Sequence, residues 1–133
     1  MGRYEELAPR AERTIDGGTY VLVLWLEQDR SMTIGRLGEV CFKRGLYFYV
    51  GSALQGIERR MRRHLGKGKS SHWHIDYLTK CATVLGAVYI LTREKDAECR
   101  VASSLCRRFN SIPGFGSSDC RCGSHLFWFA IEG

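Results

Sequence analysis

The chain has 133 residues, the length of one domain, and 44% of them are hydrophobic, enough to form a core without disulfide support. Its net charge is +6, and no apolar run is long enough to cross a membrane as a helix. The N-terminal residues are charged and lack the apolar stretch of a secretory signal, so we expect a cytoplasmic protein. These features argue against a membrane protein built from helices and against a small secreted disulfide scaffold.

The expected elements, taken in chain order, form an α+β domain. An N-terminal extension covers residues 1–16, with a short helix at 4–13, and the domain itself covers 17–133. The sequence predicts strands at 19–26, 33–37, 39–43, 46–52, 83–92 and 125–131, a turn at 29–32, and helices at 56–65, 73–80 and 94–109. The strands at 19–26 and 83–92 have the composition of interior strands. This order predicts a small mixed or antiparallel sheet flanked by helices.

The excess positive charge is concentrated in one short segment. Residues 58–69, ERRMRRHLGKGK, contain six Lys or Arg residues and one Glu. Such a block is typical of a surface that binds an anionic partner, most simply a phosphate backbone. It is equally typical of a solvated helix face, and composition does not decide between the two.

Helical periodicity places Arg60 and His64 together at the border of the apolar stripe of the helix 56–65. An arginine at such a border can hold phosphate oxygens through paired hydrogen bonds, and a histidine can exchange protons near neutral pH. The alternative is that both side chains only lie across the edge of the core.

Three tyrosines lie on the strands around this helix. Tyr47 and Tyr49 alternate onto one face of the strand 46–52, and Tyr20 begins the strand 19–26. Gly51 then permits a sharp turn or the close approach of a ligand. The tyrosines can supply hydroxyl groups to a reacting phosphate, although aromatic residues favour strands for packing reasons alone.

Glu98 shares one face of the helix 94–109 with Val101, Ala102, Leu105 and Phe109. Burial of an acidic group is unfavourable unless it is paired or bound to a cation. Its place in the first turn also suits the helix dipole, but the dipole does not explain the inward direction. We therefore favour Glu98 as a metal ligand.

The sequences GTY at 18–20 and YVG at 49–51 resemble the paired signatures of the GIY-YIG nuclease superfamily. In that superfamily a helix with an arginine, often with a histidine four residues later, follows the second signature. A separate helix carries a glutamate that binds one divalent metal, and an asparagine lies beyond it. Arg60 and His64 fit the first pair, and Glu98 and Asn110 fit the second.

The stretches WHIDYL and FGSSDCRCGSHLF further resemble a poorly characterised branch of this superfamily, a domain of unknown function. The resemblance covers residues 17–130. It implies a GIY-YIG-like fold with extra strands inserted between the two signature strands. It also implies a divalent-metal-dependent endonuclease that hydrolyses phosphodiester bonds, with DNA favoured over RNA as its partner.

The resemblance implies a role for each candidate residue. One Mg²⁺ or Mn²⁺ held by Glu98 would neutralise charge at the scissile phosphate, and Arg60 would hold a non-bridging oxygen. Tyr20 would orient or deprotonate the attacking water, His64 would relay the proton, and Tyr49 would bind the phosphate or the water. The nucleic acid would be contacted, without readout of sequence, by Arg59, Arg62, Arg63, Lys67, Lys69, His72, His74 and Asn110.

One departure from the superfamily concerns spacing. The segment between Tyr20 and Tyr49 has 28 residues, longer than in many members, and GRLGEVCFKRG is able to supply a hairpin there. The insertion leaves open whether the two signature strands pair directly. It also leaves Tyr47 as a rival for the role of Tyr49. A further alternative is a catalytically silent module that binds nucleic acid through the same basic cleft.

The six cysteines are expected to be free thiols, apart from the pair Cys120 and Cys122. These two and His125, with His72 and His74 upstream, have the chemistry of a zinc site and raise the alternative of a zinc-stabilised interaction domain. The C-x-C spacing is tighter than that of usual zinc knuckles, and a tight turn explains it as well. We therefore disfavour zinc.

Overall fold

The computed structural model describes residues 17–53, 64, 74–92, 94, 96–116 and 123–130 of the protein. The N-terminal extension with its expected helix at 4–13 lies outside these residues, as does the segment 56–65 except for His64. No helix within the described ranges is both long enough and apolar enough to cross a membrane. The described cysteines Cys41, Cys81, Cys99 and Cys106 are free thiols, as expected.

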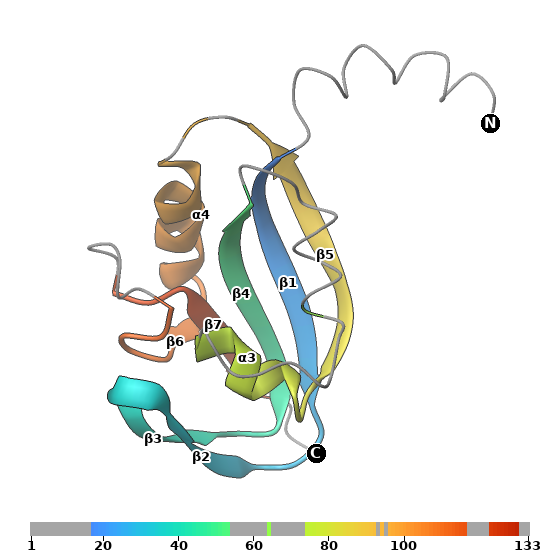
Figure 1. The fold of residues 1–133 in the computed structure, drawn as a ribbon, viewed down its shortest axis with the longest axis vertical. Coiled ribbons are helices and arrows are strands. Elements are labelled where there is room, and N and C mark those ends of the chain that lie inside the picture. The colour runs from blue at the N-terminus through green and yellow to red at the C-terminus, as the bar shows by residue number, and fades with distance from the viewer. Residues whose placement is uncertain are drawn as a thin grey trace, which may run out of the picture.

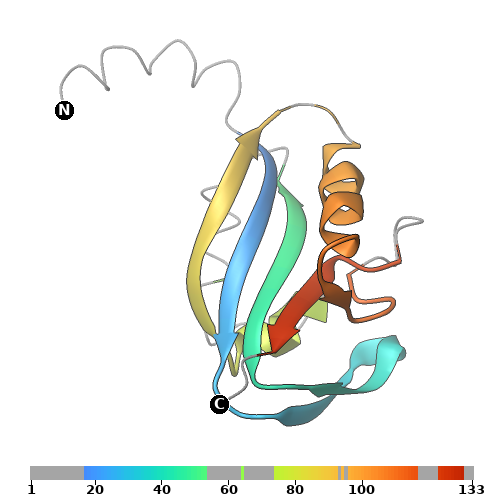
Figure 2. The same cartoon turned by 180° about the vertical axis from the view of Figure 1, so that it is seen from behind.

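An antiparallel five-stranded sheet forms the centre of the α+β fold, in the order β5-β1-β4-β7-β6 (Figures 1 and 2). A separate two-stranded hairpin is formed by β2 and β3. The strands are β1 (Gly18–Leu26), β2 (Arg30–Ile34), β3 (Gly38–Phe42), β4 (Gly45–Ala53), β5 (Thr83–Leu91), β6 (Asn110–Ser111) and β7 (Leu126–Ala130), and the helices are the 3₁₀ turn η1 (Gly35–Leu37), α3 (His74–Thr79) and α4 (Ala97–Cys106).

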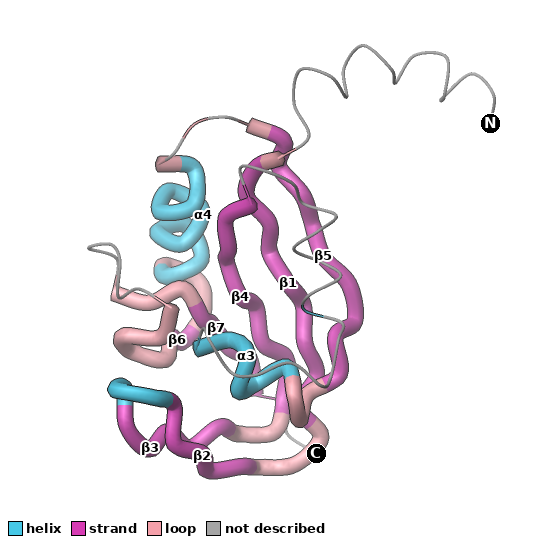
Figure 3. Tube along the Cα trace, in the orientation of Figure 1, coloured by secondary structure: helices cyan, strands magenta, loops and turns pink. Residues whose placement is uncertain are grey.

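The inserted segment between the signature strands forms the hairpin β2–β3, as expected, and leaves the main sheet at one end (Figure 3). It does not separate the signature strands: β1 pairs directly with β4, with Leu22 opposite Tyr49. The expected turn at 29–32 is wrong, because β2 already begins at Arg30. The chain turns instead over η1 and Gly38, where Gly35 and Gly38 have φ values of 46° and 89°. Glycine adopts these values without steric cost.

The larger core lies on the face of the sheet that is covered by α3 and the hairpin. It unites alternate residues of β1 and β4 with Ile75 and Leu78 of α3, Ile34 and Phe42 of the hairpin, and Phe115. The smaller core lies on the opposite face, where Ala102 of α4 packs with Val50 and Phe127. Strand alternation explains the division, because successive side chains point to opposite faces.

Two predicted elements differ in extent or place. The strand at 83–92 was expected to be interior, but β5 is an edge strand with exposed Leu85, Val88 and Leu91. Buried and exposed strands can share such an apolar composition, so composition alone wrongly predicted an interior position for this strand. The helix at 94–109 is shorter than expected, since α4 ends at Cys106 and the chain enters β6 at Asn110. Phe109 then packs on Phe48 of β4, with ring centroids 5.1 Å apart, which draws the chain away from the helix axis.

A hydrogen bond joins the start of α3 to the loop before β7. The backbone N–H of Gly116 donates to Nδ1 of His74 over 2.8 Å, and the His74 ring packs edge-on against Phe115. Nδ1 accepts this hydrogen bond only when it carries no proton. Partial burial lowers the pKa of His74 below its ordinary value, in agreement with that requirement.

This contact predicts an acid-sensitive contribution to stability. In the unfolded chain His74 has an ordinary pKa of about 6.5, so it binds a proton more readily than in the folded chain. The contribution to stability is therefore present above about pH 6.5 and is lost as the pH falls through the pKa of the folded state. In His74→Asn the amide oxygen replaces Nδ1 and does not titrate. Urea unfolding at about pH 7.5 and about pH 5 should show a smaller loss of unfolding free energy in the variant. Equal losses in both proteins would refute this role of His74.

Candidate functional site

Three polar rings converge on the face of the sheet that α3 covers. The Tyr20 hydroxyl of β1 lies 2.7 Å from Nε2 of His64, a hydrogen bond whose direction depends on the histidine tautomer. The centroid of the Tyr49 ring of β4 lies 6.4 Å from that of Tyr20 and 6.3 Å from that of His64. Relative exposures are 1% for Tyr20, 0% for His64 and 8% for Tyr49. We call these three residues the tyrosine–histidine cluster.

Direct pairing of the signature strands creates this cluster. Tyr20 lies opposite Gly51 and Leu22 lies opposite Tyr49, so the two tyrosines are diagonal neighbours on one face. A β-carbon on Gly51 would lie 2.3 Å from both Cζ and the hydroxyl oxygen of Tyr20. The glycine is therefore required because the Tyr20 ring lies against its backbone. The sequence had suggested a turn or a ligand contact here, but Gly51 is within β4 and the close group is a side chain.

Tyr47, the rival of Tyr49, belongs to a different environment. Its hydroxyl donates a 2.5 Å hydrogen bond to the backbone oxygen of Lys43, and burial raises its pKa. Its ring stacks on Trp128 and meets Phe42 edge-on, further along β4 from Tyr20. Tyr49 and not Tyr47 thus has the ring contacts with Tyr20 and His64.

Glu98, in the first turn of α4, approaches a histidine. Its Oε2 lies 2.9 Å from Nδ1 of His125, and the exposed fractions of the two side chains are 25% and 2%. The expected inward direction of Glu98 is therefore explained in part by a histidine partner. His125 is held by its backbone, since its N–H donates to Phe115 and its carbonyl accepts from Val50. Sequence reasoning had grouped His125 with the cysteines and missed this contact.

The loop residue Gly116 connects the Glu98–His125 pair to the tyrosine–histidine cluster. A β-carbon on Gly116 would lie 3.0 Å from Cε1 of Tyr49 and 3.3 Å from Cβ of His125, so these two side chains flank one glycine. The glycine also has a φ of 72°. Tyr49 and Val50 are neighbours on β4 that point to opposite faces, and His125 contacts the strand where β7 begins. Through His125, Glu98 of α4 is linked to the loop residue that contacts Tyr49, although α4 covers the other face of the sheet.

The other predicted site residues divide into those described and those outside the described part of the chain. Arg59, Arg60, Arg62, Arg63, Lys67, Lys69, His72, Cys120 and Cys122 lie outside it. Asn110 is exposed and belongs to β6, where it lies opposite Trp128 of β7. His74 uses Nδ1 for Gly116, and Asp76, two residues further along α3, is fully buried.

Glu98 has the donor chemistry of a ligand for a divalent cation. Among the described residues, no group of three or more His, Cys, Asp or Glu side chains is placed to hold a metal ion. A Mg²⁺ ion keeps several waters and needs only one or two carboxylates. The partly exposed carboxylate of Glu98, held at one oxygen by His125, has the chemistry for such an ion.

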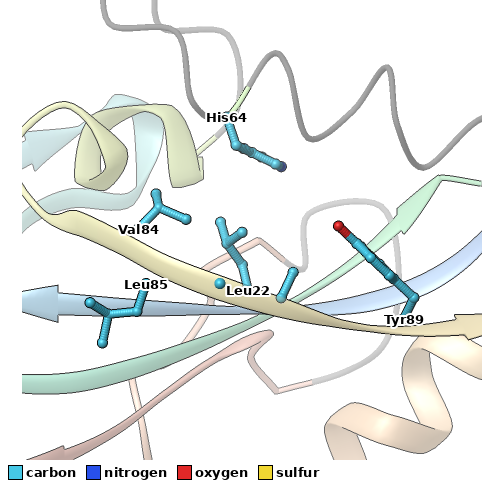
Figure 4. Close-up of a pocket in the computed structure, with 7 residues that line it drawn as sticks. Leu22, His64, Val84, Leu85 and Tyr89 are labelled. Carbon is cyan, nitrogen blue, oxygen red and sulfur yellow. The ribbon is translucent and has the colours of Figure 1, made fainter. Parts of the chain in front are cut away.

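A pocket of about 250 Å³ adjoins His64 on the side of β5. It is lined mostly by apolar residues of β1 and β5, and Figure 4 shows Val84 and Tyr89 rising from β5 on the side of His64 while Leu85 points the other way. Tyr89 lies opposite Tyr20 in the register and is half-exposed. Sequence reasoning missed this tyrosine, although it is the one residue of the apolar run 84–91 with a hydroxyl group.

The close approach at Gly51 predicts a large effect of a single methyl group. Gly51→Ala should lower the free energy of unfolding by about 1–3 kcal/mol, because the Tyr20 ring must shift away from the new β-carbon. Gly86→Ala is the matched control: Gly86 is also a strand glycine, but a β-carbon there meets nothing within 4 Å. Urea unfolding measures both variants. Similar stabilities of the two would show that Tyr20 does not need the space above Gly51.

The comparison with protein families places the whole domain in one group. The family model of the Domain of unknown function DUF123 matches residues 19–132, which include both signature strands, α3, α4 and β7. No curated protein and no solved structure matches the chain. The protein belongs to the DUF123 family.

Proposed function

We propose that the protein is a divalent-metal-dependent endonuclease of the GIY-YIG type, which hydrolyses phosphodiester bonds in nucleic acid, with DNA favoured. The observation that carries this proposal is the 2.7 Å hydrogen bond between the Tyr20 hydroxyl and Nε2 of His64, with Tyr49 beside them. A phenol and an imidazole in this contact can exchange a proton, which activation of a water requires.

The burial of the cluster supports different tasks for its members. Tyr49 is the least buried of the three, so it is the phenol that meets the phosphate or the attacking water. Tyr20 and His64 form the proton relay, in which Tyr20 accepts the proton of the water that Tyr49 binds. The attacking water gives one proton towards Tyr20 as the Tyr20 hydroxyl gives its own proton to Nε2 of a neutral His64.

The remaining steps balance charge at phosphorus. The oxygen of the deprotonated water forms a new P–O bond, and the P–O bond to the leaving oxygen breaks; that oxygen keeps the electron pair and takes a proton from bulk water. A bound divalent ion would supply charge neutralisation at the phosphate and at the departing oxygen. Glu98 would hold that ion, and His125 orients the carboxylate through its contact with Oε2.

The basic block of the sequence supplies the proposed grip on the substrate. Arg60 would bind a non-bridging oxygen, and Arg59, Arg62, Arg63, Lys67 and Lys69 would contact the phosphate backbone without reading sequence. Because these contacts release counterions, affinity for nucleic acid should fall steeply as salt concentration rises.

A second candidate function is a nucleic-acid-binding module without chemistry. The burial of Tyr20 and His64 favours it, because a polar pair in that position also satisfies its own hydrogen bonds and stabilises the fold. The two functions share salt-sensitive binding and differ in cleavage. Incubation of labelled single-stranded, duplex and branched DNA and RNA with Mg²⁺ or Mn²⁺ separates them.

Removal of one hydroxyl tests the relay. Tyr20→Phe should lower the cleavage rate by about 100-fold or more, because the water loses its proton acceptor, while binding of the substrate is unchanged. Tyr47→Phe is the control, since it removes a hydroxyl from an equally buried tyrosine of the same core. That variant should lose about 1 kcal/mol of stability and keep its cleavage rate. Equal rates for Tyr20→Phe and wild type would remove Tyr20 from the mechanism.

Neutralisation of Glu98 tests the metal site. Glu98→Gln should abolish metal-dependent cleavage and reduce binding of Mn²⁺, measured by calorimetry, because the amide is a much weaker ligand for a hard cation. Asp96→Asn removes an exposed carboxylate two residues away, which forms a surface ion pair with Arg100, and should leave both unchanged. Mn²⁺ binding that survives in Glu98→Gln would place the metal elsewhere.

A further inference from the structure

β5 has a concentration of exposed apolar side chains unlike any other element in the described part of the chain. The described residues include six exposed large hydrophobic side chains, and five of these belong to β5. They are Leu85 (58%), Val88 (59%), Tyr89 (50%), Ile90 (41%) and Leu91 (60%). Their side chains alternate between the two faces of the sheet, so β5 has exposed apolar side chains on both faces. Contiguous apolar surface of this kind marks an interaction site.

The strand also ends the described sheet. In the order β5-β1-β4-β7-β6, β5 has β1 on one side and no described strand on the other (Figures 1 and 2). Its sequence, TVLGAVYIL, has no charged residue and no proline. Edge strands of soluble proteins are usually protected by lysine, proline or a bulge that turns the edge away. The register shift opposite Val23 and Leu24 affects only the first residues of β5 and leaves 86–91 in continuous pairing with β1.

The register shows which backbone groups face outward. The N–H of Thr92 donates to the carbonyl of Gly17, and the Ile90 carbonyl lies against Gly18, so even-numbered residues here direct their polar groups to β1. Alternation then directs the N–H and C=O groups of Ala87, Tyr89 and Leu91 away from β1. In the described part of the chain no strand pairs with these groups, which lie beside the exposed side chains.

We propose that this edge is the interface of a homodimer, in which β5 pairs antiparallel with β5 of a second copy to form one continuous sheet. Antiparallel pairing of identical strands is self-complementary about a two-fold axis, so it closes after two copies. The chain has a net charge of +6, and β5 is an uncharged strip along which two cationic copies can approach. A nucleic acid needs cations on the surface it contacts, and this strand supplies none.

The pairing has a geometric consequence for the candidate site. The two-fold axis of an antiparallel pair is perpendicular to the sheet, so both tyrosine–histidine clusters would lie on the same face of the joined sheet. Three strand spacings separate β1 from its symmetry mate, about 14 Å in all. If the proposed function holds, two centres would face one nucleic acid together. The dimer itself does not depend on that function.

A positive charge on β5 tests the interface. In sedimentation velocity experiments over a range of protein concentrations, the wild type should shift between the mass of 15.1 kDa and twice that mass. One paired strand is a small interface, so the dimer should dissociate on dilution. Val88→Lys, and the double variant Val88→Lys with Leu91→Lys, should raise the dissociation constant more than about tenfold, because like charges would face each other across the strands.

Phe129→Lys is the matched control, because Phe129 is 53% exposed but belongs to the interior strand β7. It should leave the dissociation constant unchanged, and circular dichroism should show that all variants are folded. A wild type that stays monomeric at every concentration would overturn the proposal. So would assembly that continues past two copies, equal effects of Val88→Lys and Phe129→Lys, or a mass shift that nuclease treatment of the sample removes. None of these readouts uses cleavage, so the dimer can fail while the proposed function stands.

Discussion

The contact between the Tyr20 ring and the backbone of Gly51 is the constraint on which the candidate site depends. A strand residue with any side chain at position 51 would occupy the space of the Tyr20 hydroxyl. With glycine there, Tyr20 lies across its neighbour strand and its hydroxyl reaches Nε2 of His64. The pairing of β1 with β4 thereby fixes two of the three cluster residues through backbone hydrogen bonds. Strands hold side chains more rigidly than loops do, which suits a site that needs fixed geometry.

Residues from the two cores come close together beside β4, at the beginning of β7. The two cores are divided by strand alternation, with Tyr49 on one side and Val50 on the other. At the beginning of β7, however, His125 binds the backbone of Val50 and lies beside Gly116 and Tyr49. Glu98 needs only to reach His125 to approach that edge. An inward carboxylate on α4 and a phenol on the opposite face are in this way linked by one histidine.

The sequence predicted the parts of the fold that follow from local periodicity. Alternation in LYFYVGS placed Tyr47 and Tyr49 on one face, and helical spacing turned Glu98 inward, as the structure has them. Contacts between distant segments were beyond such reasoning: whether β1 and β4 pair across the inserted hairpin depends on long-range packing, and so does the meeting of Glu98 with His125. The place of β5 at the end of the described sheet was not predicted, because an exposed apolar strand and a buried strand can share the same composition. Tyr89 was missed with it.

Burial divides the candidate site into an inner pair, Tyr20 and His64, and an outer pair, Tyr49 and Glu98, which retain contact with the surface. In a site of low dielectric a neutral hydrogen bond is strong, whereas a new imidazolium is penalised unless an opposite charge lies close by. A phosphodiester at the outer pair would bring that negative charge. Proton transfer to His64 would then be favourable chiefly when substrate is present. In the proposed mechanism, the burial of the pair would therefore restrict proton transfer to the complex with substrate. A relay exposed to water would lack this restriction, since solvent would stabilise the charged form at all times.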